Sequence, residues 1–389
     1  MQSHSQILRL GISTALSTVV KKRVLNCLWE LTYRCNARCG ICSYWKTPTD
    51  SKTELTLQEI QEGLKKIRAY GCRFINFTGG EPTIRRDLEQ IVHSASCLGM
   101  WTSVVSNGSL LTRERIRALK NAGLDNLMLS LDSLDPWVHD EHRGIPGLHA
   151  KVLECLRWIS QDFLSGHRTG GIMCVLSKRN LHQIAGVVAL AEELGVYLVF
   201  QPYHQNKTGD PHQGSLATKE TIDELLALKK KSGALLSSRA YLAGILRFCQ
   251  GVSLPRCQAG CKYFSVDPCG FLHPCVDGPR VGHILRDDLA ATQSAEARKA
   301  VASCQGCWYC FRGEADSTLS LRGYAEKLRL AFSVILRNAL RRTRRAVANA
   351  GSPATGNRDA QPRCSSGLLQ VSVPNSYFSI VDRWGTEKL

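Results

Sequence analysis

The sequence lacks a hydrophobic run long enough to cross a membrane, since no stretch reaches the roughly 18 apolar residues of a transmembrane helix. It also lacks the polar bias of a disordered chain, because 43% of its 389 residues are hydrophobic and 21% are charged. The apolar run over residues 7–20 contains Arg9, precedes Lys21 and Lys22, and ends without a small-residue cleavage site. We therefore expect an amphipathic helix over residues 1–24 and not a secretion signal.

Acidic residues are scarce: 33 Asp and Glu face 50 Lys and Arg, a net charge of +17. Residues 322–345 carry eight basic residues and one acid, which is +7 locally. An apolar stripe runs through this stretch at helical spacing, so we predict a basic amphipathic helix over residues 319–350. Such a helix either lies on the inner face of a membrane or packs on its own domain. Pro, Gly and Ser after it predict a disordered tail over residues 351–389.

Seventeen cysteines are too many, in too long a chain, for a secreted disulfide scaffold. Ten of them crowd into three places: Cys35, Cys39 and Cys42; Cys257, Cys261, Cys269 and Cys275; Cys304, Cys307 and Cys310. Clusters of this kind in a reducing cytosol favour metal or iron–sulfur binding, which predicts a cytoplasmic protein. The other seven cysteines are expected to be small buried hydrophobes.

Strand-like and helix-like segments alternate after residue 25. The expected strands are Asn26–Thr32, Phe74–Thr78, Thr102–Ser106, Asn126–Leu131, Gly171–Leu176 and Tyr197–Pro202. The expected helices are Thr56–Tyr70, Leu88–Leu98, Arg113–Ala122, His149–Phe163 and Leu181–Leu194, followed by Lys219–Ser232. Six such units predict the α/β class, with a parallel sheet forming a partial (βα)6 barrel of the TIM type over residues 25–235.

The character of the sequence changes over residues 249–313, which are rich in cysteine, glycine and proline and show little periodicity. Such a segment is not expected to build a large apolar core. We therefore predict a small second domain that a metal cluster holds together.

The first cysteine group has the spacing C-x3-C-x2-C, at Cys35, Cys39 and Cys42, without a fourth cysteine nearby. Three thiolates can hold three irons of a [4Fe–4S] cube and leave the fourth iron open for chemistry. A zinc site is the alternative, although it would want a fourth Cys or His close by.

This segment resembles the signature of the radical S-adenosylmethionine (SAM) superfamily. In that family the open iron chelates the amino and carboxylate groups of SAM, and electron transfer cleaves SAM to a 5′-deoxyadenosyl radical, which takes a hydrogen atom from the substrate. The position before the third cysteine is commonly aromatic in the family and packs near adenine. It is Ile41 here, a branched apolar residue that can still cover the ring.

Further segments resemble the family in order and position. The sequence Gly79-Gly80-Glu81-Pro82 resembles the motif that receives the SAM amino group, and Asn107 lies in a turn that resembles a lining of the cofactor pocket. Alternation along a strand places Ser130 and Asp132 on one face, where they can bind a ribose or the polar end of SAM. Arg143 resembles an arginine that faces the SAM carboxylate, and the alternative is a surface salt bridge with Asp140 or Glu141.

The second cysteine region resembles the SPASM/twitch extension that follows some radical SAM cores. Six plausible ligands remain once Cys269 is set aside as a non-ligand, namely Cys257, Cys261, Cys275, Cys304, Cys307 and Cys310. This number favours one auxiliary [4Fe–4S] cluster, with two clusters or a zinc site as alternatives. The resemblance makes Cys257, Cys275, Cys304 and Cys307 the favoured set.

The favoured hypothesis is therefore a radical SAM enzyme of oxidoreductase or maturase type, acting on a peptide, a small molecule or a lipid-linked substrate. Its implied partners are a reductant such as flavodoxin or ferredoxin and the unidentified substrate, which Gln201, Tyr203 and His204 would line. The auxiliary cluster would either take an electron from the substrate radical or hold the substrate. The competing hypothesis is a non-catalytic iron–sulfur or zinc protein that binds nucleic acid through its basic helix, a partner that no recognised RNA-binding module supports.

Overall fold

Six parallel strands build one curved sheet, and they are the strands that the sequence predicts. In the computed structural model they are β1 (Asn26–Thr32), β2 (Phe74–Gly79), β3 (Trp101–Ser106), β4 (Asn126–Ser130), β5 (Thr169–Leu176) and β6 (Tyr197–Pro202). Neighbours pair in the order β6-β5-β4-β3-β2-β1, with every pair parallel. The sheet does not close on itself, so the predicted α/β class and partial barrel are confirmed.

The structure describes residues 26–209, 218–304 and 306–317, together with residues 325, 326, 329, 330 and 333. All of them belong to one compact unit that spans Met1–Thr355. The predicted helix over residues 1–24 and the predicted tail over residues 351–389 lie outside the described residues. So does nearly all of the predicted basic helix over residues 319–350.

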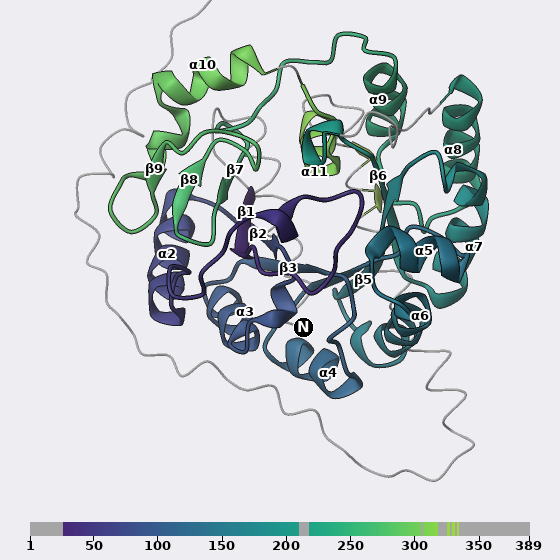
Figure 1. The fold of residues 1–389 in the computed structure, drawn as a ribbon, viewed down its shortest axis with the longest axis horizontal. Coiled ribbons are helices and arrows are strands. Elements are labelled where there is room, and N and C mark those ends of the chain that lie inside the picture. Colours follow the sequence, from purple (N-terminus) through teal and green to yellow (C-terminus); the bar gives the residue numbers. More distant parts are fainter. Residues whose placement is uncertain are drawn as a thin grey trace, which may run out of the picture. The chain divides into compact units, whose positions relative to one another are not determined.

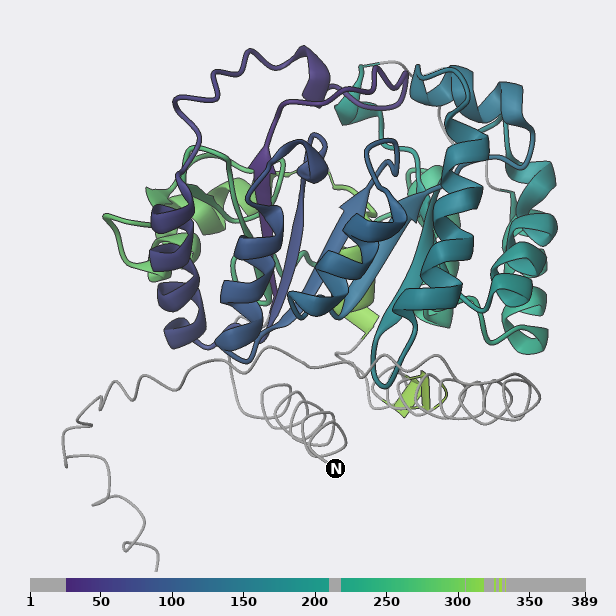
Figure 2. The same cartoon turned by 90° about the horizontal axis from the view of Figure 1, so that it is seen from below.

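Helices follow the strands and cover the outer side of the curved sheet (Figures 1 and 2). They are α2 (Leu57–Tyr70), α3 (Leu88–Cys97), α4 (Arg113–Asn121), α5 (Pro136–Arg143), α6 (Leu148–Trp158), α7 (Ile184–Leu194), α8 (Lys219–Lys231) and α9 (Arg239–Cys249). The predicted capping box is present at the start of α2, where Thr56 and Glu59 satisfy each other's backbone N–H groups. Gly71 ends this helix at a φ of 115°, which a residue with a side chain rarely adopts.

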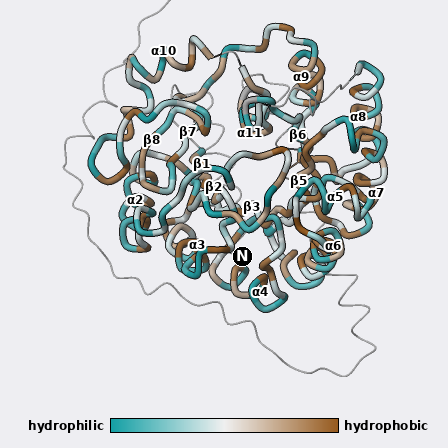
Figure 3. The backbone as a smooth tube through the Cα atoms, viewed as in Figure 1, coloured by the Kyte–Doolittle hydropathy of each residue, from teal (hydrophilic) through white to brown (hydrophobic). Residues whose placement is uncertain are grey.

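The apolar faces of these helices pack on the strands, and Figure 3 shows hydrophobic residues gathered where the two meet. Trp29, Phe77 and Phe200 are among the largest fully buried side chains and come from β1, β2 and β6. None of the helices in the described part of the chain is long and apolar enough to cross a membrane.

The cysteine-rich segment extends the same sheet. Strand β7 (Tyr263–Val266) pairs in parallel with β1, and β8 (Phe271–His273) and β9 (Gly282–His283) continue it antiparallel, which gives nine strands. Two helices follow, α10 (Ala295–Ser303) and α11 (Cys310–Ser317).

This segment also contributes to the main core, through Phe264, Val266, Leu272, Ile284 and Trp308. The sequence predicted a metal cluster as the means that holds this segment together, and it did not predict this shared core. The segment lacks a core of its own and shares that of the barrel, which provides the apolar surface that its short strands cannot.

Candidate functional site

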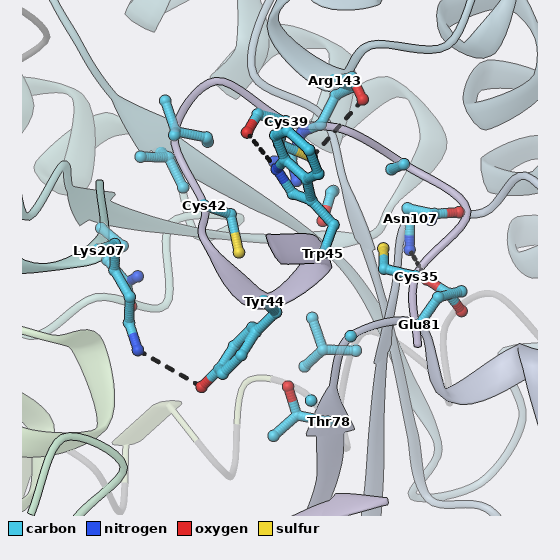
Figure 4. A pocket seen from close by; sticks show the side chains of 18 of the residues that line it. Cys35, Cys39, Cys42, Tyr44, Trp45, Thr78, Glu81, Asn107, Arg143 and Lys207 are labelled. Atoms are coloured by element: carbon cyan, nitrogen blue, oxygen red, sulfur yellow. Dashed lines mark hydrogen bonds between the residues drawn. The ribbon is translucent and has the colours of Figure 1, made fainter. Parts of the chain in front are cut away.

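The three cysteines of the first group border one cavity of about 220 Å³ at the carboxyl ends of the strands. Figure 4 shows their side chains together with Glu81, Asn107 and Arg143. The cavity is also lined by other residues that the sequence singled out, namely Gly79, Gly80, Ser130 and Ile41. Pro82 and Asp132 are not among its lining residues; Pro82 begins a short turn, Pro82–Ile84, directly behind Glu81.

The glycines after β2 allow the cysteine-bearing loop to lie directly on this strand end. Gly80 N–H donates to Thr32 O at 2.7 Å, and Glu81 N–H donates to Arg34 O at 2.9 Å. A Cβ atom on Gly80 would lie 2.3 Å from Arg34 O, which no real contact allows. The sequence suggested that these glycines let a ligand approach. They also let two backbone segments meet, which fixes the start of the loop beside Cys35.

The end of α5 holds the other side of the same loop. Arg38 N–H donates to Arg143 O at 3.2 Å, and Gly40 N–H donates to His142 O at 3.1 Å. The Cys39 Sγ lies 3.6 Å from Arg143 O. The loop is therefore held between β2 and α5, although each of these contacts joins residues far apart in the sequence.

Glu81 is a carboxylate that is 1% exposed and surrounded by hydrogen-bond donors. One oxygen accepts from Ser106 Oγ at 2.8 Å and from Thr83 N–H at 3.0 Å, and the other accepts from Asn107 N–H at 2.7 Å. The Thr83 hydroxyl is a further donor. This side chain therefore joins the ends of β2 and β3 and presents fixed negative charge to the cavity.

Asp132 and Arg143 form a buried ion pair behind the cavity. The Arg143 guanidinium donates to both Asp132 oxygens, at 2.7 and 2.8 Å, and Val175 N–H donates to the same carboxylate at 2.9 Å. Burial opposes ionisation of Asp132, but Arg143 and His142 outweigh it and lower the pKa of Asp132 well below its usual range. The alternative of a surface salt bridge between Arg143 and Asp140 or Glu141 is therefore wrong.

The donor set of the first cavity fits an iron–sulfur cluster with one open iron. It comprises three cysteine sulfurs, and no fourth cysteine is among the described residues that line the cavity. Burial raises the pKa of Cys35 to about 12 in the metal-free chain, so metal binding would release its proton. No three His, Cys, Asp or Glu side chains in the described ranges converge closely enough to hold a single metal ion.

A second cavity, of about 190 Å³, lies in the cysteine-rich segment and is lined by four cysteines: Cys257, Cys275, Cys304 and Cys307. These are the four that the sequence favoured. Burial raises the pKa of Cys275 to about 12 and that of Cys307 to about 11. The four sulfurs fit a fully ligated iron–sulfur cluster.

The remaining cysteines of this segment are not among the residues that line the second cavity. Cys261 and Cys310, which the sequence kept as alternative ligands, belong to this group. So does Cys269, which the sequence set aside and whose sulfur lies 3.8 Å from Thr53 Oγ1.

Comparison with known proteins identifies a family over the first part of the chain. Residues 29–191 match the family described as the Radical SAM superfamily. These residues form a radical SAM domain.

Relatives and solved structures extend the likeness beyond that domain. A PqqA peptide cyclase from Bradyrhizobium diazoefficiens is 28% identical over 252 residues, which are 64% of this chain and 65% of the relative. An AdoMet-dependent heme synthase from Methanosarcina barkeri is 34% identical over 44% of this chain and 49% of its own. The chain thus spans less than two thirds of these relatives.

Two solved structures share the fold. Streptococcus suis SuiB bound to its precursor peptide SuiA aligns with a TM-score of 0.60 at 15% identity, over 76% of this chain and 70% of that one. The enzyme anSMEcpe with bound AdoMet aligns with a TM-score of 0.54 at 18% identity, over 84% of this chain and all of the other. The part of this chain that matches these folds is therefore longer than the radical SAM domain alone.

The first cavity is also lined by residues from β6 and the loop after it. Gln201, Tyr203 and His204, which the sequence proposed for the substrate, are among its lining residues. Tyr44, Trp45, Lys207 and Tyr309 line it too and were missed. No local signal marks these four, because they meet only through the tertiary structure.

Tyr309 and Lys207 lie between the two cavities. Tyr309 lines both of them. The Lys207 ammonium lies 4.7 Å from the Tyr44 ring centre and 5.6 Å from that of Tyr309, and it forms an ion pair with Asp277 at 2.8 Å. Figure 4 shows Lys207 directed at the Tyr44 hydroxyl. Tyr309 and Lys207 therefore link the two cavities through one aromatic side chain and one ammonium group.

Proposed function

We propose that this chain is a radical SAM enzyme in which Cys35, Cys39 and Cys42 hold a [4Fe–4S] cluster with one iron open to SAM. The convergence of these three cysteines with Glu81 and Arg143 in one cavity carries the proposal. A cluster bound there supplies the electron that cleaves SAM, and the resulting 5′-deoxyadenosyl radical takes a hydrogen atom from the substrate.

The side chains around the cavity have separate tasks in this proposal. Glu81 offers negative charge to the SAM ammonium group, and Arg143 offers two N–H donors of fixed geometry to its carboxylate. Asn107 and Ser130 face the cavity beside them, where hydroxyl groups of the ribose can be bound. Asp132 acts as a positioning residue, since it holds the Arg143 guanidinium and does not line the cavity itself.

We propose further that Cys257, Cys275, Cys304 and Cys307 ligate one auxiliary [4Fe–4S] cluster. Their presence around one cavity supports this set over any that includes Cys261 or Cys310. The predicted domains, a core over residues 25–235 and an auxiliary domain over residues 249–313, would then each carry one cluster.

A peptide is the substrate class that we favour. One relative is named a peptide cyclase, and the SuiB structure contains a precursor peptide. The end of the first cavity that Gln201, His204 and Lys207 line would receive the reacting residue of the peptide. The electron for each turnover would come from a flavodoxin or ferredoxin in the cytoplasm.

Anaerobic reconstitution of the full chain tests the proposal. Two clusters correspond to about eight irons per chain. A triple Cys35/Cys39/Cys42→Ala variant should keep about half of the iron and form no 5′-deoxyadenosine from SAM and dithionite. A Cys269→Ala variant is the matched control, since this cysteine lines neither cavity, and it should keep both iron and cleavage. SAM cleavage by the triple variant would contradict the assignment, and its absence from the parent would favour the non-catalytic alternative.

Transfer of deuterium tests the substrate. Candidate precursor peptides, deuterated at their side chains, are incubated with the reconstituted chain, SAM and reductant. Mass spectrometry should then find deuterium in 5′-deoxyadenosine and a matching loss from the peptide. Cleavage of SAM without any deuterium transfer would exclude the peptides tested and leave the radical chemistry intact.

Membrane contact through residues 319–350 stays a prediction. Flotation of the full chain with anionic and neutral liposomes would test it, against a variant in which four arginines of the stretch are replaced by Gln: Arg341, Arg342, Arg344 and Arg345. Equal recovery of both proteins in both lipid mixtures would exclude a tether.

A further inference from the structure

Side chains around the second cavity place hydrogen-bond donors on its cysteine sulfurs. The Tyr263 hydroxyl lies 3.1 Å from Cys257 Sγ. A metal-bound thiolate carries no proton, so the phenol must be the donor once a cluster is present. Tyr263 is 1% exposed and lies on β7, the strand that pairs with β1, so its hydroxyl has little freedom to turn away.

Arg312 brings a positive charge to another sulfur. It is 3% exposed and lines the cavity, and its guanidinium lies 3.9 Å from Cys307 Sγ. The same guanidinium donates to Cys307 O and, at 2.8 Å, to Pro255 O. These contacts hold the guanidinium beside the Cys307 sulfur. Because the site is buried, water screens the charge of the guanidinium poorly there.

A backbone donor completes this arrangement at a third sulfur. Gly306 N–H lies 3.4 Å from Cys304 Sγ, and Gly306 O accepts from His204 Nε2 at 3.2 Å. His204 lines the first cavity, so a single residue, Gly306, joins the proposed substrate side to the Cys304 sulfur.

Donors and cations near cluster sulfurs favour the reduced, more negative state and raise its reduction potential. We infer that Arg312 and Tyr263 raise the reduction potential of the cluster that the second cavity would hold. This inference rests on the proposed auxiliary cluster. Tyr309 lines both cavities, so one side chain separates that cluster site from the first cavity.

Redox titration of the auxiliary cluster alone tests the inference. The full chain carrying the Cys35/Cys39/Cys42→Ala substitutions retains only the second site, and its potential is measured by electron paramagnetic resonance at a series of fixed potentials. Arg312→Gln should lower the ratio of reduced to oxidised cluster about tenfold at a fixed potential, which is about 59 mV for one electron. Tyr263→Phe removes one hydroxyl and should lower the ratio by a smaller factor. Arg312→Lys keeps the charge and should fall between the parent and Arg312→Gln.

Two substitutions of residues that do not line the cavity are the matched controls. Arg113→Gln removes an arginine that pairs with Asp162, and Tyr70→Phe removes a hydroxyl that accepts from Gln293. Neither should move the potential. If Arg312→Gln fails to bind iron, the inference is tested by comparing the reduction potentials of Arg312→Lys and Tyr263→Phe with that of the parent.

The possible outcomes separate this inference from the proposed function. Unchanged potentials in Arg312→Lys and Tyr263→Phe at full iron content would overturn the tuning role and leave the cluster in place. Zinc, or no metal, in the triple variant would overturn the auxiliary cluster itself.

Discussion

Replacing Asp132 by Asn should destabilise the chain strongly. The carboxylate has no exposed side-chain surface and receives two N–H groups of Arg143, at 2.7 and 2.8 Å. The substituted amide would have nearly the same shape, but it would leave a guanidinium that is only 10% exposed without its counter-charge. Removing one partner of a buried ion pair costs about 3–5 kcal/mol. We therefore expect the free energy of unfolding to fall by that amount.

Urea unfolding of the metal-free chain, followed by circular dichroism, measures this loss. The matched control is Asp223→Asn, which removes an acid from the exposed pair with Lys219, where the side chains are 60% and 75% exposed. Exposed pairs contribute at most about 1 kcal/mol. The double variant Asp132→Leu/Arg143→Met removes both charges and should regain much of the stability, although it also removes the arginine proposed to bind the SAM carboxylate.

The pH dependence of this effect follows from the lowered pKa of Asp132. A carboxylate with a depressed pKa in the folded state stabilises the fold above its unfolded pKa of about 3.9 and loses this contribution only in stronger acid. The Asp132→Asn loss should therefore be equal at pH 5.5 and pH 8. A loss no larger than that of Asp223→Asn would refute the reasoning.

Three further predictions concern the site and its surroundings. Gly80→Ala would place a Cβ atom 2.3 Å from Arg34 O and push the cysteine-bearing loop away from the end of β2. Metal analysis should therefore find that iron at the first site is lost while about half of the total iron stays. Full iron content would contradict the role of Gly80 in holding this loop. Burial lowers the pKa of His139 to about 4, so the folded chain binds fewer protons than the unfolded chain below about pH 6.5. The free energy of unfolding should therefore fall by up to about 3 kcal/mol as pH falls from 7 to 4. Urea titrations of His139→Gln should show a smaller loss of stability over this pH range, and an identical loss would exclude His139 as the origin. Tyr44→Phe removes a donor to the buried carboxylate of Glu30 and should cost about 1–3 kcal/mol, a loss that equal urea midpoints would refute.

Local sequence signals account for most of the secondary structure. The strands Asn26–Thr32 and Tyr197–Pro202 begin and end where predicted, and the other four differ by one or two residues. Helix α5 was missed, although Asp135 caps it and Pro136 opens it, two signals that sequence reasoning can use. Helix α9 was missed despite a capping serine, Ser238.

What the sequence determined by itself is the chemistry of the site. The spacing of Cys35, Cys39 and Cys42, and the Gly-Gly-Glu segment at a strand end, specify ligand types and place them at one edge of a parallel sheet. The spacing of the cysteines and the alternation along each strand are local properties. Because the carboxyl ends of parallel strands lie at the same edge of a sheet, these local properties are enough to place the ligands at one edge.

Only the tertiary structure decided which of these groups meet. It placed Asp132 behind the cavity, where Arg143 neutralises a charge that could not be buried alone. It joined β7 to β1, because the short strands of the cysteine-rich segment needed a core that only the barrel could supply. It also placed Tyr309 in the lining of both cavities. Contacts of this kind depend on packing between segments far apart in the chain, and no local pattern in the sequence encodes them.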